Sequence, residues 1–217
     1  MTTTADGPAN MTRAMLRLGV AAGWVYLLVG GLQILLRPGF DVTRHPLSVL
    51  VNGDFGWVQV ANFVVTALLL MAGAIGLVRG ESGRGRLVSA VLLLIYGFSL
   101  LLAGIFKADP GAGFPPGTPD TAAISTQGLV HFAIGGVGFL AFIAAALIRA
   151  RVHFKSQESG RGWFALITGL VFLGAFAGIA SGAGSAATVL GFYAAVILSF
   201  VWLIATFGRA VRSASGR

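Results

Sequence analysis

The chain has 217 residues, of which 56% are hydrophobic and only 10% are charged, far from the composition of a soluble domain. Its net charge of +8 does not indicate nucleic-acid binding, because the basic residues lie between apolar blocks rather than beside stacking aromatics on one face. The absence of cysteine excludes disulfides, thiolate metal sites and cysteine nucleophiles. Composition therefore indicates a membrane protein with no nucleic-acid partner.

Six apolar segments are each long enough to cross a hydrocarbon core of about 30 Å as an α-helix. In chain order they cover residues 16–36, 57–78, 87–106, 127–148, 163–182 and 186–207. They lack the alternation of lipid-facing strands, and only helices or closed barrels satisfy the backbone within lipid. We therefore predict an all-α fold, a six-transmembrane-helix bundle over residues 16–208, with an N-terminal tail at 1–15 and a basic tail at 209–217.

Basic residues are distributed very unequally between the two sides of these predicted helices. The side that carries both termini holds twelve of them, and the other side holds three. The twelve are Arg13, Arg17, Arg79, Arg84, Arg86, Arg149, Arg151, Lys155, Arg161, Arg209, Arg212 and Arg217, and the three are Arg37, Arg44 and Lys107. The positive-inside rule places the arginine-rich side in the cytoplasm. We therefore predict a multi-pass protein of the cell membrane with both termini cytoplasmic.

Two connections on the outer side are long and rich in proline. They span residues 37–56 and 107–126 and contain six of the seven prolines of the chain. Because proline lacks a backbone donor and interrupts helices, neither connection can be mainly helical. We expect both to form compact caps.

The inner connections share a pentapeptide, Glu-Ser-Gly-Arg-Gly, at residues 81–85 and 158–162. A duplication of three helices would relate the second-to-third connection to the fifth-to-sixth, whereas this match relates it to the fourth-to-fifth. We interpret the pentapeptide as polar turn chemistry used twice.

Polar residues of the predicted helices fall on glycine-lined faces near the outer boundary. Gln33 lies on the first helix, Gln59 and Asn62 on the second, and His131 on the fourth. We expect them to form, with the outer loops, an outward-facing polar pocket between helices 1, 2 and 4 that binds a small molecule or lipid. The candidate residues are Gln33, Asp41, Arg44, His45, Ser48, Asp54, Trp57, Gln59, Asn62, Lys107, Asp109 and His131.

The partner expected for His131 is Asn62, Gln59 or Asp109. Alternatively, these groups only link helices, at about 0.6–2 kcal/mol each.

Two other functions remain open. An outward-facing intramembrane enzyme would use His131, Asp109 and residues of the first loop, possibly with a metal held by His45, His131 and a carboxylate from Asp41, Asp54 or Asp109. No close spacing of ligands supports a metal, so we expect neither metal nor cofactor. The third function is that of a membrane scaffold or interaction protein.

Glycines at four-residue spacing form a ridge on the fifth predicted helix, at Gly174, Gly178 and Gly182. Such ridges allow close contact between helices, either within a bundle or between subunits. We favour packing against a neighbouring helix, and the sequence leaves the oligomeric state open. Membrane lipids are the partners that the composition itself predicts.

Several short motifs in and beside the outer loops are distinctive in combination. Residues 44–48 read Arg-His-Pro-Leu-Ser, residues 53–59 read Gly-Asp-Phe-Gly-Trp-Val-Gln, and Asn62 and Phe63 follow. The second loop contains Ala-Gly-Ile-Phe-Lys-Ala-Asp-Pro at 103–110, Gly-Phe-Pro at 113–115, Gly-Thr-Pro at 117–119 and Gly-Leu-Val-His at 128–131. Over roughly residues 20–205 the chain resembles the prokaryotic integral membrane proteins of the DUF998 family, most strongly between 40 and 135. The resemblance implies six helices but no settled reaction, substrate or cofactor.

Overall fold

The computed structural model describes residues 6–121 and 123–215. Within them the elements are α1 (Asp6–Leu36), a 3-10 helix η1 (Leu47–Val51), α2 (Gly56–Gly80), α3 (Arg84–Ile105), α4 (Thr126–Lys155), α5 (Ser159–Ala180) and α6 (Ala186–Ser215). All six α-helices of this described part are long and apolar enough to cross a membrane. The predicted all-α, six-span membrane fold is confirmed.

Three of the helices extend well beyond their apolar segments. α1 begins at Asp6, α4 ends at Lys155 and α6 ends at Ser215, which gives lengths of 31, 30 and 30 residues. At 1.5 Å per residue each is about 45 Å long, more than the hydrocarbon core needs. Residues 6–15 and 209–215, assigned to tails from the sequence, therefore continue α1 and α6, while Arg217 lies outside the described residues.

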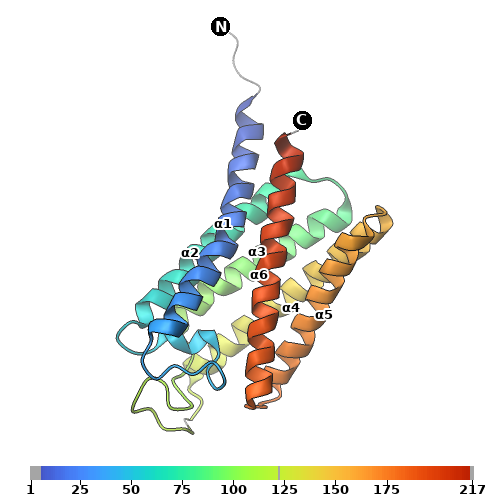
Figure 1. Cartoon of the computed structure of the whole chain (residues 1–217). Helices are drawn as coiled ribbons and strands as arrows, with labels where there is room; N and C mark the ends of the chain where they lie inside the picture. The colour runs from blue at the N-terminus through green and yellow to red at the C-terminus, as the bar shows by residue number, and fades with distance from the viewer. Residues whose placement is uncertain (1–5, 122, 216–217) are drawn as a thin grey trace.

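The helices form a ring in which each packs against its neighbours in sequence (Figure 1). α6 closes the ring by packing along α1, and it also touches α2. The start of α1 and the end of α6 lie at one end of the bundle, together with the turns at 81–83 and 156–158; we call this the arginine end. The segments 37–55, 106–125 and 181–185 lie at the opposite end, which we call the loop end.

Glycines allow the first two helices to approach each other closely. A Cβ added at Gly73 on α2 would lie 2.5 Å from the Cα of Gly19 on α1, and one at Gly76 would lie 3.0 Å from Leu16. Small residues at such crossings let backbones meet, which is how helices associate where lipid supplies no hydrophobic driving force. The glycine-lined faces expected on these two helices therefore pack against one another.

Aromatic side chains fill the middle of the ring. Phe142 on α4 is fully buried, and its ring centroid lies 5.3 Å from that of Tyr96 on α3, 5.1 Å from Phe172 on α5 and 5.6 Å from Trp202 on α6. We call these four residues the aromatic layer. They join four helices across the centre of the bundle.

Candidate functional site

The two proline-rich loops dock onto each other through His45. This side chain is 2% exposed and packs against the rings of Phe40 and Phe114, which also contact each other. Its Nδ1 accepts a hydrogen bond from the backbone N–H of Asp41 at 2.9 Å, so the ring proton lies on Nε2, which donates to the carbonyl of Ala112 at 2.8 Å. Both ring nitrogens are therefore engaged in joining the first loop to the second.

Two arginines complete this cap. The guanidinium of Arg37 donates to the carbonyls of Leu50, at 3.0 Å, and Asn52, and it lies 5.2 Å from the centre of the Phe114 ring. Arg44 forms an exposed ion pair of 2.6 Å with Asp120. The compact caps expected from the prolines thus form one unit, held by polar groups from both loops.

The polar residues of α1 and α2 bind to one another. Gln33 Nε2 donates to Gln59 Oε1 at 2.7 Å, Asn62 Nδ2 donates to the same oxygen at 3.2 Å, and the Thr66 hydroxyl donates to Asn62 Oδ1 at 3.3 Å. All four side chains are buried. Gln33 Oε1 and Gln59 Nε2 have no hydrogen-bond partner within the described part of the chain. The structure does not bring this network together with His131, because α4 packs between α3 and α5.

His131 contacts the end of α3 instead. Its Nδ1 donates to the carbonyl of Phe106 at 2.7 Å, so none of the three expected partners, Asn62, Gln59 and Asp109, is its hydrogen-bond partner. The Asp109 carboxylate accepts from the backbone N–H of Ser125 at 2.7 Å and from its hydroxyl at 2.5 Å. Ser125 in turn caps α4 by accepting from the N–H of Gly128 at 3.0 Å. Asp109 is therefore held by the positive N-terminus of α4, where a carboxylate is favoured.

The remaining candidates lie on the rim of the loop end. Asp41 accepts from the backbone N–H and the hydroxyl of Thr43 at 2.8 and 2.7 Å, and these bonds hold the pKa of its carboxyl below the usual value. Asp54, Trp57 and Lys107 are exposed. Among the residues that the structure describes, no group of three His, Asp or Glu side chains is placed to hold a metal ion. The expected set of His45, His131 and Asp109 does not converge.

A cavity of about 550 Å³ opens at the loop end, and we call it the loop-end cavity. Its wall is mostly apolar and draws on all six helices and on both proline-rich loops. The aromatic residues that line it are Tyr26, Phe63, Tyr96, Phe132, Phe139, Phe176, Phe192 and Tyr193. Of the candidates named from the sequence, Ser48, Asp109 and His131 line it, and the other nine do not.

The aromatic wall is the part of this cavity that the sequence analysis missed. Phe132 and Phe139 are seven residues apart on α4, and Phe176 on α5 packs against both, with centroids 6.4 and 5.3 Å away. Phe192 on α6 lies 5.6 Å from Phe139. The seven-residue spacing marks one face of a helix, but the last two helices read only as generic apolar spans. Phenylalanines on one face of each of these helices were the sequence feature that could have indicated an aromatic wall.

The glycine ridge on α5 makes little contact with other helices. A Cβ at Gly178 would lie 3.2 Å from Thr188 on α6, whereas one at Gly174 would meet nothing within 4 Å in the described structure. Gly182 follows the end of α5 with a φ of 77°, a left-handed conformation that favours glycine. Of the three glycines, only Gly178 lies against a neighbouring helix.

Comparison with known proteins agrees with the motifs in the loops. Residues 20–210 match the model of a family described as a protein of unknown function, DUF998, which confirms the resemblance seen in the sequence. The match includes α5 and most of α6, where the sequence motifs were least specific. No curated protein and no solved structure shows a significant match.

Proposed function

Since the chain belongs to the DUF998 family of proteins of unknown function, we propose an activity from its geometry alone: it binds the apolar chain of a lipid-like amphiphile in the loop-end cavity. The proposal rests on a cavity of about 550 Å³ with an aromatic wall inside a membrane-spanning bundle. That volume falls within the range of about 300–1,000 Å³ that small-molecule sites occupy. A mostly apolar wall leaves no polar group unpaired against a hydrocarbon chain and offers it van der Waals contact, so such a chain suits the cavity.

The open side of the cavity supports a ligand that enters from lipid. Two residues of α4 that line it, Leu129 and Phe132, are 60% and 46% exposed. Apolar side chains exposed on a membrane-spanning protein face hydrocarbon rather than water. A hydrocarbon chain therefore meets a continuous apolar surface from the bilayer into the cavity.

Polar groups at the cavity select the other end of the ligand. Ser48 and His131 offer hydrogen-bonding groups, and Asp109 is the one carboxylate among the lining residues described. Because Asp109 carries negative charge, a neutral or cationic head group is favoured at this end over an anionic one. The ligand class we propose is an amphiphile of that charge.

The arginine end is proposed to face the cytoplasm. All basic residues counted on that side, apart from Arg217 outside the described residues, lie at this end. The positive-inside rule supports this orientation, and the cell membrane is the membrane to which it applies here. The loop-end cavity would then open toward the outer leaflet.

A cavity-filling variant with a matched control tests the proposed ligand. Gly135 lines the cavity, and a Cβ there meets nothing within 4 Å, so Gly135→Leu is expected to place its side chain in the cavity. Gly174→Leu is the control, because Gly174 is also helical and open but lies outside the cavity. The probe is a long-chain alkyl amine that carries a diazirine, added to the purified protein in detergent.

On illumination, we expect cross-links on the peptides that contain Phe132, Phe176 and Phe192. They should be strongly reduced in Gly135→Leu and retained in Gly174→Leu. Equal labelling of the two variants, or labelling spread evenly over the lipid-facing surface, would show that the cavity does not bind the chain.

A further inference from the structure

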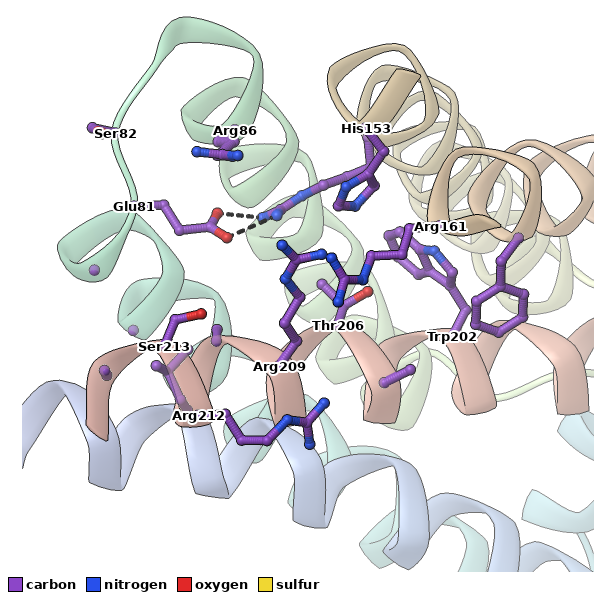
Figure 2. A pocket seen from close by; sticks show the side chains of 18 residues that line it. Glu81, Ser82, Arg86, His153, Arg161, Trp202, Thr206, Arg209, Arg212 and Ser213 are labelled. Carbon is purple, nitrogen blue, oxygen red and sulfur yellow. Dashed lines mark hydrogen bonds and ion pairs between the residues drawn. The ribbon is translucent and has the colours of Figure 1, made fainter. Parts of the chain in front are cut away.

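A second cavity, of about 280 Å³, lies at the arginine end (Figure 2), and we call it the arginine-end cavity. It lies between the turn after α2 and the ends of α3, α4, α5 and α6, with Leu16 of α1 in its wall. Five arginines line it, Arg86, Arg149, Arg161, Arg209 and Arg212, together with His153, whose Nδ1 donates to Glu158 at 2.6 Å. These arginines come from four different helices, so the fold itself gathers them.

Two carboxylates neutralise part of this charge. Glu81 accepts from two nitrogens of Arg149, at 2.8 and 2.6 Å. Glu158 accepts from Arg161 at 2.8 Å and from both terminal nitrogens of Arg209, one of them at 2.9 Å. Five arginines thus line one cavity that has two carboxylates beside it, which leaves three positive charges in excess. The guanidinium of Arg212 lies at the exposed rim, turned away from Arg161 and Arg209 (Figure 2).

The excess is concentrated on arginines without an acidic partner. Neither Arg86 nor Arg212 has a carboxylate within ion-pair distance among the described residues, while the other three arginines are all paired. Like charges in a partly enclosed site repel one another more than they do in bulk water. A cavity with this charge concentrates anions and is stabilised by binding one.

Membrane topology alone does not account for this arrangement. The positive-inside rule requires basic residues at the cytoplasmic end but sets no direction for their side chains. Arg84 and Arg151 meet that requirement as exposed residues outside the cavity.

The two copies of the pentapeptide have a role at this cavity, because Glu81 and Glu158 are their first residues and hold Arg149 and Arg209 in place.

We propose that the arginine-end cavity binds a phosphoryl group. Guanidinium forks match the geometry of phosphate oxygens, and the hydroxyls of Ser82, Thr206 and Ser213 supply further donors at the wall. Trp202, Phe164 and Leu16 form an apolar side of the same cavity. The phosphoryl group belongs either to a soluble phosphate ester or to a lipid head group, and both sources present the same oxygens.

The test uses inorganic pyrophosphate and short-chain phosphatidic acid as probes on the full-length protein in neutral detergent. Binding is measured from the shift in the thermal unfolding midpoint at physiological ionic strength, where the Debye length is about 8 Å and distant surface charges are screened. The test variant is Arg86→Gln with Arg212→Gln. The control is Arg84→Gln with Arg151→Gln, which removes the same charge from exposed positions.

Neither arginine of the test variant is in an ion pair, so both networks around Glu81 and Glu158 persist and the variant should fold. We expect its apparent affinity to fall by roughly tenfold or more, since each charged hydrogen bond contributes about that factor, while the control binds normally. A response to both probes assigns a soluble phosphate, and a response to phosphatidic acid alone assigns a lipid head group. Equal loss in test and control variants, or no response to either probe, would overturn the site.

Discussion

Arg149 on α4 and Glu81 in the turn after α2 are joined by two parallel hydrogen bonds of 2.8 and 2.6 Å. The arginine side chain is 3% exposed, and its Nε also donates to the hydroxyl of Ser89 at 2.8 Å. An arginine that the sequence analysis counted only for its side of the membrane is thus a buried link between two helices and a turn.

Removing one member of this pair should be costly. Glu81→Ala leaves a buried guanidinium without its counter-charge, and we expect it to lower the free energy of unfolding by about 3 kcal/mol. The measurement is reversible unfolding in detergent. Arg151→Ala, exposed on the same helix, is the control and should change stability by less than about 0.5 kcal/mol. Similar losses in both variants would contradict a structural role for the pair.

Gly128 is required by the capping of α4. A Cβ at this position would collide with the Asp109 carboxylate. That carboxylate accepts a hydrogen bond from Ser125, the N-cap residue of α4. We expect Gly128→Ala to displace Asp109 and to cost about 1–2 kcal/mol of stability, the usual cost of a lost N-cap. Gly135→Ala on the same helix meets nothing within 4 Å and should be neutral or slightly stabilising. The measurement is the thermal unfolding midpoint of each variant. A midpoint of Gly128→Ala at or above that of Gly135→Ala would contradict the prediction.

The carboxylate of Glu158 should make stability depend on acid pH. Hydrogen bonds from Arg209 and His153, together with the charges of Arg209 and Arg161, lower its pKa from 4.5 to about 2. A lowered folded-state pKa contributes stability that is complete above the unfolded value and is lost as pH falls through the folded value. The stability difference between the native protein and Glu158→Gln should therefore be constant above about pH 5 and shrink as pH falls from about 4.5 to about 2. A difference that is constant over this range would show that the ion pairs do not couple to folding.

Gln59 should be the critical member of the network between α1 and α2. Its Oε1 accepts from both Gln33 and Asn62, so Gln59→Leu removes the acceptor that they share. Each amide nitrogen then keeps only one longer bond, to the carbonyl of Val29 at 3.3 Å or of Tyr26 at 3.4 Å. We expect a loss of about 1–3 kcal/mol, part of which is recovered when Gln33→Leu removes one of those donors. Detergent unfolding of the two single variants and the double variant measures the coupling. Strictly additive losses would argue against the network.

The proposed orientation can be read by cysteine labelling, because the chain contains no cysteine. Cysteines at Ser82, Ser156 and Ser213 should be protected from an impermeant thiol reagent in intact cells, and a cysteine at Thr121 should react. All four positions are exposed, so burial does not confuse the result. Ser48 is a weaker outer reporter, since it is half-buried and lines the loop-end cavity. Labelling at Ser156 without labelling at Thr121 would reverse the orientation.

The sequence predicts the helices well because hydropathy and charge act locally. Every predicted span agrees with its helix to within two residues, apart from the polar extensions at the arginine end. It also predicts correctly that Gln33, Gln59 and Asn62 lie on the packed faces of their helices. A helical wheel shows which face is buried, but it does not show which helix lies opposite. For that reason the sequence predicts a shared pocket for His131 and residues of α1 and α2, although α4 packs between α3 and α5.

Contacts made by the loops could not be predicted in the same way. Ser125 has the residue type of an N-cap just before a helix, and this could be read locally. Its partner Asp109 is sixteen residues away across a proline-rich loop whose course no periodicity describes. Glu81 and Arg149 are separated by 68 residues, and they meet only because α4 packs beside α3.

The aromatic layer divides the molecule into two electrically distinct halves. Tyr96 lines the loop-end cavity, Trp202 lines the arginine-end cavity, and the fully buried ring of Phe142 touches both. These rings replace water in the centre of the bundle, and a transmembrane voltage falls across the apolar thickness of protein and bilayer rather than at its aqueous ends. Moving one charge across the whole membrane involves about 2.3 kcal/mol per 100 mV, but an anion that enters the arginine-end cavity crosses little of that field. Binding of an anion at this proposed site should therefore depend little on membrane potential.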